Sequence, residues 1–169
     1  MSIISFIKEA GEKLFGHRDS PAAAAPAAAA DPAAQQAKAA DANQNAAKAI
    51  ESYIKSQNFS ADGLAVEYDG SQQAVTVSGV APDQVTKEKI VLCCGNVQGV
   101  AKVNDMLTVE QPADESRYYT VVKGDTLSAI AKKEYGNANE YMKIFDANKP
   151  MLSNPDKIYP GQLLRIPAA

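Results

Sequence analysis

The sequence of 169 residues has little histidine, no glycine-rich phosphate loop and no excess of basic charge. With His17 as its one histidine, it offers neither a histidine-containing metal cluster nor a Ser–His–Asp triad. The net charge of −3 argues against general nucleic-acid binding, which needs basic patches to replace the counterions of phosphate. We therefore expect a binding protein and not an enzyme, with no nucleic-acid partner.

Cysteine and long apolar runs are also scarce. Cys93 and Cys94 are sequence neighbours, a geometry that strains a disulfide, so we expect them to be small buried apolar residues. The apolar run over residues 3–7 is short and charged residues follow it directly. Such a run is too short for a membrane span and does not fit an export signal. These absences predict a cytoplasmic protein without a membrane partner.

Alanine, in contrast, is abundant, and 15 of the 30 alanines lie in the first 45 residues. Apolar residues three and four positions apart predict a short helix over 3–15. The Ala/Pro-rich composition of residues 16–31 is typical of a linker. Asp31 followed by Pro32 is a typical helix start, and it predicts a helix that runs to about residue 57.

The rest of the chain alternates between strand-like and helix-like segments, which indicates an α+β fold. Asp69 and Gly70 form a turn signal between two alternating segments, so a β-hairpin is predicted there. A helix is predicted over 82–94, with Pro82 in its first turn and Gly95 as its C′ cap. Further strands are predicted over 64–68, 74–78 (ended by Gly79), 99–109, 118–122 and 163–166, and further helices over 127–135 and 137–148.

Several motifs resemble known domains. The C-terminal region contains, in order, YTV, GDTLSAIA, YGN, IFDAN and IYPGQLLRIP, and it resembles a LysM domain with the order βααβ. The middle region contains VTVSGV and GNVQGVAKVNDML and resembles a BON domain with the order αββαβ. The combination, together with FIKEAGEKLF near the N-terminus, is similar to the small cytoplasmic BON–LysM potassium-binding proteins of bacteria.

This resemblance implies a division of the chain into five parts. They are an N-terminal helical segment (1–16), an Ala/Pro-rich and partly helical linker (17–45), a BON domain (46–110), a short linker (111–117) and a LysM domain (118–169).

The resemblance also implies that K⁺ is the ligand, and neutral carbonyl oxygens suit this large cation. Alignment with the family's ion site gives six backbone carbonyls as ligands: Ile7, Lys8, Ala10, Gly95, Val97 and Val100. Such a protein would be a K⁺ sensor or buffer that becomes more compact on binding, and we expect a monomer. The alternative for this region is that Gly11 and Gly95 simply cap two helices.

A second hypothesis is that the LysM domain binds glycans that contain N-acetylglucosamine, such as peptidoglycan. LysM domains hold such chains in a shallow groove between two loops, and Tyr159 could stack on a sugar ring. The corresponding residues are Gly124, Asp125, Thr126, Leu127, Ile158, Tyr159 and Pro160. The alternative is that these residues only cap and pack the fold, with Asp125 or Thr126 as an N-cap and Tyr159 against the helices.

Overall fold

The structure, a computed structural model, describes residues 32–168. The predicted helix at 3–15 and the greater part of the predicted linker lie outside the described residues. The first unit consists of α2 (Pro32–Ser56), β1 (Asp62–Asp69), β2 (Ala74–Asp83), α3 (Gln84–Gly95) and β3 (Lys102–Gln111). The second unit consists of β4 (Arg117–Thr120), α4 (Leu127–Tyr135), the 3₁₀ helix η1 (Ala138–Glu140), α5 (Tyr141–Ala147) and β5 (Leu163–Ile166). The predicted α+β fold is confirmed for this part of the chain.

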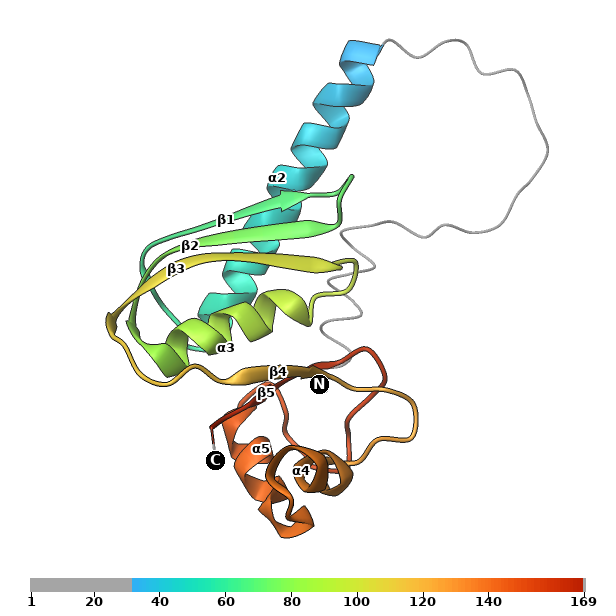
Figure 1. The fold of residues 1–169 in the computed structure, drawn as a ribbon. Helices are drawn as coiled ribbons and strands as arrows, with labels where there is room; N and C mark the ends of the chain where they lie inside the picture. Colours follow the sequence, from blue (N-terminus) through green and yellow to red (C-terminus); the bar gives the residue numbers. More distant parts are fainter. Residues whose placement is uncertain (1–31, 169) are drawn as a thin grey trace, which may run out of the picture.

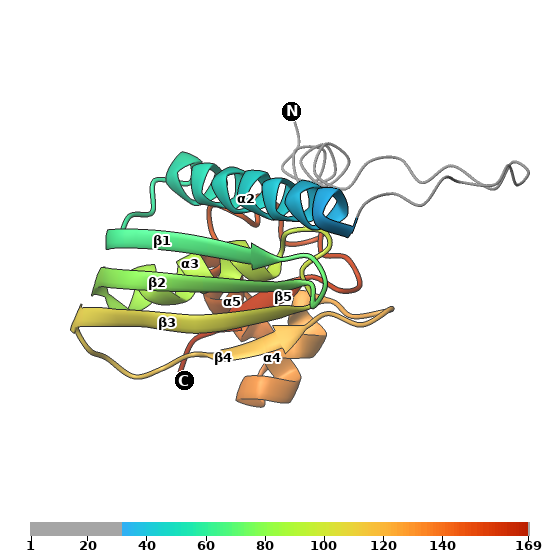
Figure 2. The same cartoon turned by 90° about the horizontal axis from the view of Figure 1, so that it is seen from above.

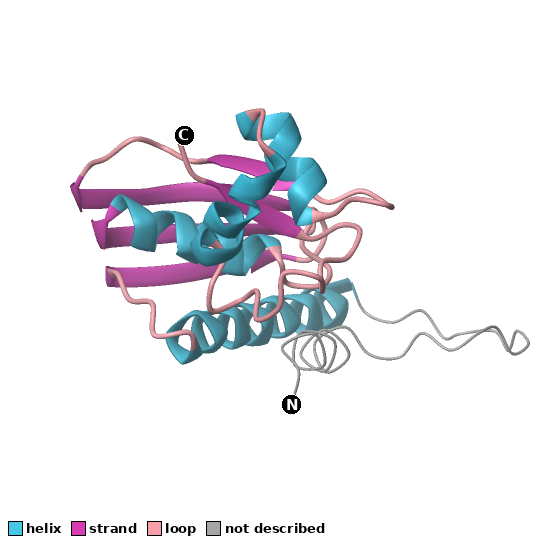
Figure 3. Ribbon diagram, turned by 90° about the horizontal axis from the view of Figure 1, so that it is seen from below, coloured by secondary structure: helices cyan, strands magenta, loops and turns pink. Residues whose placement is uncertain are grey.

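The first unit is a three-stranded sheet with two helices. The strand order is β1-β2-β3, with β1 antiparallel and β3 parallel to β2. Helix α3 lies behind the strands in Figure 2 and in front of them in Figure 3. The core gathers apolar side chains from α2, β2 and α3, among them Ile50, Ile54, Val75, Val77 and Ile90. The second half of α2 therefore packs against the sheet and closes the core of this unit.

The boundary between β2 and α3 differs from the prediction. Pro82 lies in β2, and Asp83 is the N-cap of α3, where its Oδ1 accepts a hydrogen bond from Thr86 N at 2.7 Å. Gly79 does not end β2 but lies within it, at φ 138°. A Cβ there would lie 3.0 Å from the carbonyl oxygen of Asp62, so glycine permits the close approach of β1.

In the second unit, two short helices pack against an antiparallel pair of strands. Strand β4 pairs with β5, and the core includes Leu127, Ile130, Ile144, Leu164 and Ile166. The helix predicted over 137–148 is divided, because η1 precedes α5. In Figure 1, α3 lies between the three-stranded sheet and the β4–β5 pair, so this helix belongs to the core of one unit and contacts the other.

Candidate ion-binding loop and domain interface

The end of α3 and the loop that leads from it to β3 carry three of the predicted ligands, the carbonyls of Gly95, Val97 and Val100. We refer to residues 95–101 as the ion-binding loop. The side chain of Val97 is buried, and that of Val100 packs against the same core. The hydroxyl of Tyr68 in β1 donates a hydrogen bond to the carbonyl of Gly99 at 3.1 Å. These contacts fix the path of the loop, so its carbonyls are held in place by the sheet and the core.

The electrostatics of this loop suit a cation. It follows the C-terminus of α3, where unpaired carbonyls and the helix dipole concentrate partial negative charge. The last turn of α3 contains no basic residue, whereas that of α4 contains Lys132 and Lys133. The carbonyl oxygen of Val97 accepts a hydrogen bond from Val100 N at 3.1 Å and retains a second lone pair. The loop thus offers neutral oxygens in a region of negative potential.

These oxygens fit a weakly hydrated monovalent cation better than a divalent one. Divalent ions such as Ca²⁺ usually require carboxylate ligands. Within residues 32–168, no group of three or more His, Cys, Asp or Glu side chains could hold a metal ion. The other predicted ligands, Ile7, Lys8 and Ala10, lie outside the described residues, so the structure describes three of the six predicted ligands.

Gly95 is not the C′ cap that the sequence predicted. It is the last residue of α3, without the left-handed backbone of such a cap, and Asn96 at φ −95° is the C-cap. Glycine is needed at position 95 because a strand of the second unit packs against it. A Cβ on Gly95 would lie 2.6 Å from Cδ2 of Leu163 in β5, so the missing side chain allows β5 to approach the end of α3.

Asn96 joins the two units directly. Its side-chain Nδ2 donates to the carbonyls of Leu92 at 3.1 Å and Leu163 at 2.9 Å. In return, Leu163 N donates to Oδ1 of Asn96 at 2.8 Å. The amide therefore pairs with both backbone groups of Leu163, as a neighbouring strand would. Sequence reasoning missed this residue, although an asparagine just after the predicted cap at Gly95 was a visible signal.

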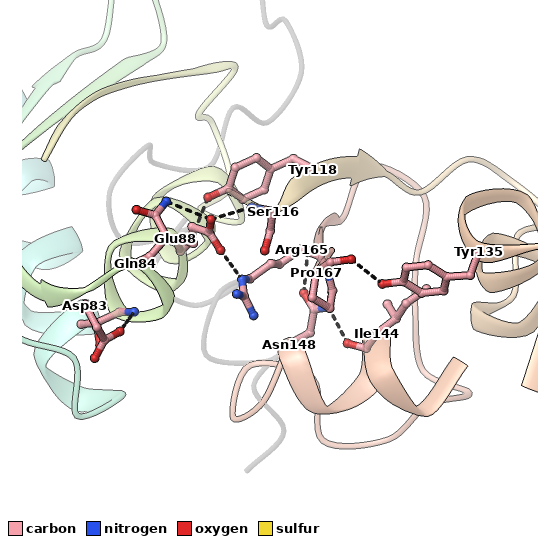
Figure 4. A network of polar contacts seen from close by, with 11 residues as sticks. Asp83, Gln84, Glu88, Ser116, Tyr118, Tyr135, Ile144, Asn148, Arg165 and Pro167 are labelled. Carbon is pink, nitrogen blue, oxygen red and sulfur yellow. Dashed lines mark hydrogen bonds and ion pairs between the residues drawn. The ribbon is translucent and has the colours of Figure 1, made fainter. Parts of the chain in front are cut away.

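Asn148 forms the same arrangement inside the second unit. It follows α5, and its Nδ2 donates to the carbonyls of Ile144 at 2.7 Å and Arg165 at 2.8 Å. Arg165 N donates to its Oδ1 at 2.8 Å (Figure 4). Leu163 and Arg165 are two positions apart, so their backbone groups point to the same edge of β5. Two asparagines, one from each unit, thus close the edge of β5 that faces away from β4.

A buried ion pair reinforces this interface. Nε of Arg165 lies 2.5 Å from Oε2 of Glu88 in α3, and their side chains are 9% and 3% exposed. Glu88 also accepts hydrogen bonds from Gln84 Nε2 at 3.0 Å and Ser116 N at 2.7 Å, while Tyr118 donates to its backbone carbonyl (Figure 4). Burial raises the pKa of Glu88, but these hydrogen bonds together hold the pKa below its ordinary value. Glu88 therefore remains ionised opposite Arg165.

Apolar contacts cross the interface as well. Met151 of the second unit belongs to the core of the first, and its sulfur lies 3.4 Å from Sγ of Cys93. Cys93 and Cys94 are both free and fully buried, which confirms the prediction for them. Burial raises the pKa of both thiols, that of Cys94 to about 12. Neither cysteine is a ready nucleophile while the two units are in contact.

The predicted glycan site coincides in part with a groove of about 310 Å³ in the second unit. Its lining residues are Asp125, Thr126, Leu127, Ser128, Tyr141, Pro155, Asp156 and Ile158. Four of the predicted residues are among them, whereas Gly124, Tyr159 and Pro160 are not. Sequence reasoning missed Tyr141, which supplies the aromatic ring of the groove.

Several of the predicted glycan-site residues also have structural roles. The hydroxyl of Thr126 accepts a hydrogen bond from Ala129 N at 3.1 Å and caps α4. The carboxylate of Asp125 accepts one from the Tyr119 hydroxyl at 2.9 Å. Tyr159 N donates a hydrogen bond to Oε1 of Gln162 at 3.2 Å.

Comparison with known proteins identifies both units. Residues 41–111 match the BON domain family, and residues 119–167 match the LysM domain family. The chain is 43% identical over 167 residues to the potassium binding protein Kbp of Escherichia coli O6:H1, with 99% of each chain covered. Across the described residues, no helix has the length and apolar character needed to cross a membrane.

Two further relatives match shorter regions. An uncharacterized protein of Deinococcus radiodurans is 46% identical over 82 residues, which are 42% of this chain and 32% of that protein. The uncharacterized protein YqbP of Bacillus subtilis is 41% identical over 58 residues, which are 29% of this chain and 26% of that protein. This chain has both a BON and a LysM domain and is similar to Kbp over its full length. It therefore belongs to the BON–LysM family of the potassium binding protein Kbp.

Proposed function

We propose that this protein binds K⁺ and acts as a monomeric sensor or buffer of cytoplasmic potassium that becomes more compact on binding. The observation that carries the proposal is the loop of neutral carbonyls that follows α3, which has no basic residue in its last turn. The full-length similarity to a potassium binding protein supports the same ligand. BON and LysM are binding domains and not enzymatic families, which agrees with a non-catalytic role.

In this proposal, six backbone carbonyls surround the ion. Gly95, Val97 and Val100 supply three of them, and Ile7, Lys8 and Ala10 in the N-terminal segment supply the others. Because the ligands are backbone atoms, most substitutions at these positions should preserve binding. The ion would join the N-terminal segment to the BON domain. A ligand that binds only the ordered state shifts the population toward that state.

Calorimetric titration of the full chain with K⁺, Na⁺ and Ca²⁺ at constant ionic strength tests this function. We expect heat of binding with K⁺ but not with Na⁺ or Ca²⁺, and a smaller radius of gyration by solution scattering only with K⁺. Scattering also gives the molecular mass and so tests the monomer. Deletion of residues 1–10 should abolish the response, and a truncated protein that still responds to K⁺ would contradict the shared site.

The groove of the LysM domain supports a second candidate function, the binding of N-acetylglucosamine-containing glycans. Titration with chitin oligomers should then shift the NMR signals of the groove residues, and Tyr141→Ala should weaken binding. Tyr159→Ala is the matched control, because Tyr159 does not line the groove. A response to the oligomer without any response to K⁺ would favour glycan binding as the main function.

A further inference from the structure

We infer that Asn96 is a positioning residue that couples the ion-binding loop to the LysM domain. This inference rests on the proposed function and specifies how occupancy of the loop reaches β5. Asn96 stands between Gly95 and Val97, two of the proposed ligands. Its side chain makes hydrogen bonds to both backbone groups of Leu163.

Asn96 lies between two proposed ligands of the ion. An ion held by the carbonyls of Gly95 and Val97 fixes the backbone on both sides of Asn96. The hydrogen bond from Asn96 N to the carbonyl of Leu92 at 3.2 Å already holds the residue at the end of α3. The ion therefore restricts the directions in which the Asn96 side chain can point and favours the one that meets β5.

The edge of β5 depends on Asn96 for its hydrogen bonds at Leu163. Leu163 has one N–H and one C=O on the edge that faces away from β4, and Asn96 binds both. When the BON and LysM domains separate, this part of the strand edge loses its partner. Coupling between two binding events is reciprocal, so a docked LysM domain must also favour the loop conformation that holds the ion.

Gly95 itself packs closely against Leu163 of β5. The side chain of Leu163 fills the space that a Cβ on Gly95 would occupy. The proposed ligands Gly95 and Val97 therefore flank the one side chain that binds β5, and Gly95 itself contacts β5. A change in the loop backbone cannot occur without changing these contacts, because closely packed groups transmit small displacements.

The test is a K⁺ titration of four full-length proteins: wild type, Asn96→Ala, Asn96→Asp and Asn148→Ala. Asn148 makes two matching hydrogen bonds to β5 and one to the carbonyl four residues before it in α5, but it touches no proposed ligand, so it controls for a general loss of stability. Thermal unfolding in K⁺-free buffer shows that each variant is folded. We expect the dissociation constant for K⁺ to rise ~10-fold in Asn96→Ala, a typical size for coupling between sites.

Asn96→Asp covers the case in which the alanine variant does not fold. It keeps the size and the acceptor for Leu163 N but cannot donate to the Leu163 carbonyl. Its added negative charge by itself favours a nearby cation, so weaker K⁺ binding in this variant would be due to the lost hydrogen bond. Solution scattering should also show a smaller K⁺-induced compaction in both Asn96 variants than in the wild type.

The outcomes separate this inference from the proposed function. If the wild type binds K⁺ and the folded Asn96 variants bind it equally well, the coupling role is wrong and the function stands. If Asn148→Ala weakens binding as much as Asn96→Ala, the effect is general destabilisation and the inference again fails. If the wild type does not bind K⁺ at all, the proposed function fails, and the inference fails with it.

Discussion

Asn96 and Asn148 each make two side-chain hydrogen bonds to β5 and one to the carbonyl four residues before them, yet they lie in different domains. Asn148 is 1% exposed and holds α5 against β5 inside the LysM domain. Asn96 is only half-buried and connects the BON domain to the same strand edge. The comparison shows how one local geometry serves two purposes. The buried Asn148 stabilises one domain. The half-buried Asn96, beside the candidate ion site, makes hydrogen bonds that form only when the two domains are in contact.

Removal of the Arg165 side chain should have the largest effect, because this residue contacts both domains. Its backbone binds Asn148 and its side chain pairs with the buried Glu88. Arg165→Met leaves that carboxylate without its cation, which costs about 3–5 kcal/mol for buried pairs. The free energy of unfolding in urea measures the loss. Addition of Glu88→Gln should recover part of it, and a loss below about 1 kcal/mol would show that the pair is weaker than its burial indicates.

The two asparagines should differ in their effect on stability. Asn148→Ala leaves the buried backbone N–H and C=O of Arg165 without their side-chain partners, at about 1–3 kcal/mol for each unsatisfied group. Asn96→Ala should cost about 1 kcal/mol, because water can reach its half-buried partners. Urea unfolding of both variants in K⁺-free buffer measures the difference. Equal losses would indicate that the domain interface is as tightly closed as the LysM core.

Acid should weaken the interface between the domains before it weakens their cores. The pKa of Glu88 is lower in the folded protein than its ordinary value of about 4.3. The stability from this group is therefore present above that pH and is lost as the pH falls through the folded-state pKa. We expect the alkylation rate of Cys93, which lies beneath Met151, to rise in this acid range when corrected for thiol ionisation. Glu88→Gln should lack this pH dependence.

The smallest effect on stability should come from Gly95→Ala. This variant tests whether glycine is needed at position 95 to end the helix or to make room for Leu163. Alanine in a helix is favoured over glycine by about 1 kcal/mol, so the change should stabilise α3 if nothing else is near. The new Cβ, however, meets the flexible end of the Leu163 side chain. We expect the two effects nearly to cancel, and a gain of stability when Leu163→Ala is already present. A double-mutant cycle measures this coupling.

The fold could be predicted from the sequence where local signals agree with burial. The helix over 127–135 was predicted with its observed limits, because Thr126 is a good N-cap and Leu127, Ile130 and Ala131 share one face. The BON strands followed from alternation of apolar and polar residues. The prediction was wrong at Gly79 and Pro82, because the end of β2 depends on close contact with β1 and on the cap of α3 by Asp83.

At the candidate sites, too, prediction from the sequence failed where contacts between distant residues decide the structure. Asp125, Thr126, Leu127 and Ile158 were placed at the groove by the resemblance to LysM domains, whereas Tyr141 comes from a helix that is close only in the folded domain. Asn96 was missed because its partner Leu163 is 67 positions away in the chain. No local pattern distinguishes an asparagine that caps a helix from one that also binds a distant strand.

The sequence by itself determined the two domains and the order of their elements, whereas the carbonyl ligands of the candidate ion loop came only from the family resemblance. The domains and their elements depend on local propensity, on the spacing of apolar residues and on motifs, all of which are written in neighbouring residues. Only the tertiary structure decided that Gly95 makes room for Leu163, that Asn96 completes the edge of β5 and that Glu88 pairs with Arg165. Each of these contacts satisfies a backbone group, a charge or a packing space that becomes buried only when the two domains meet.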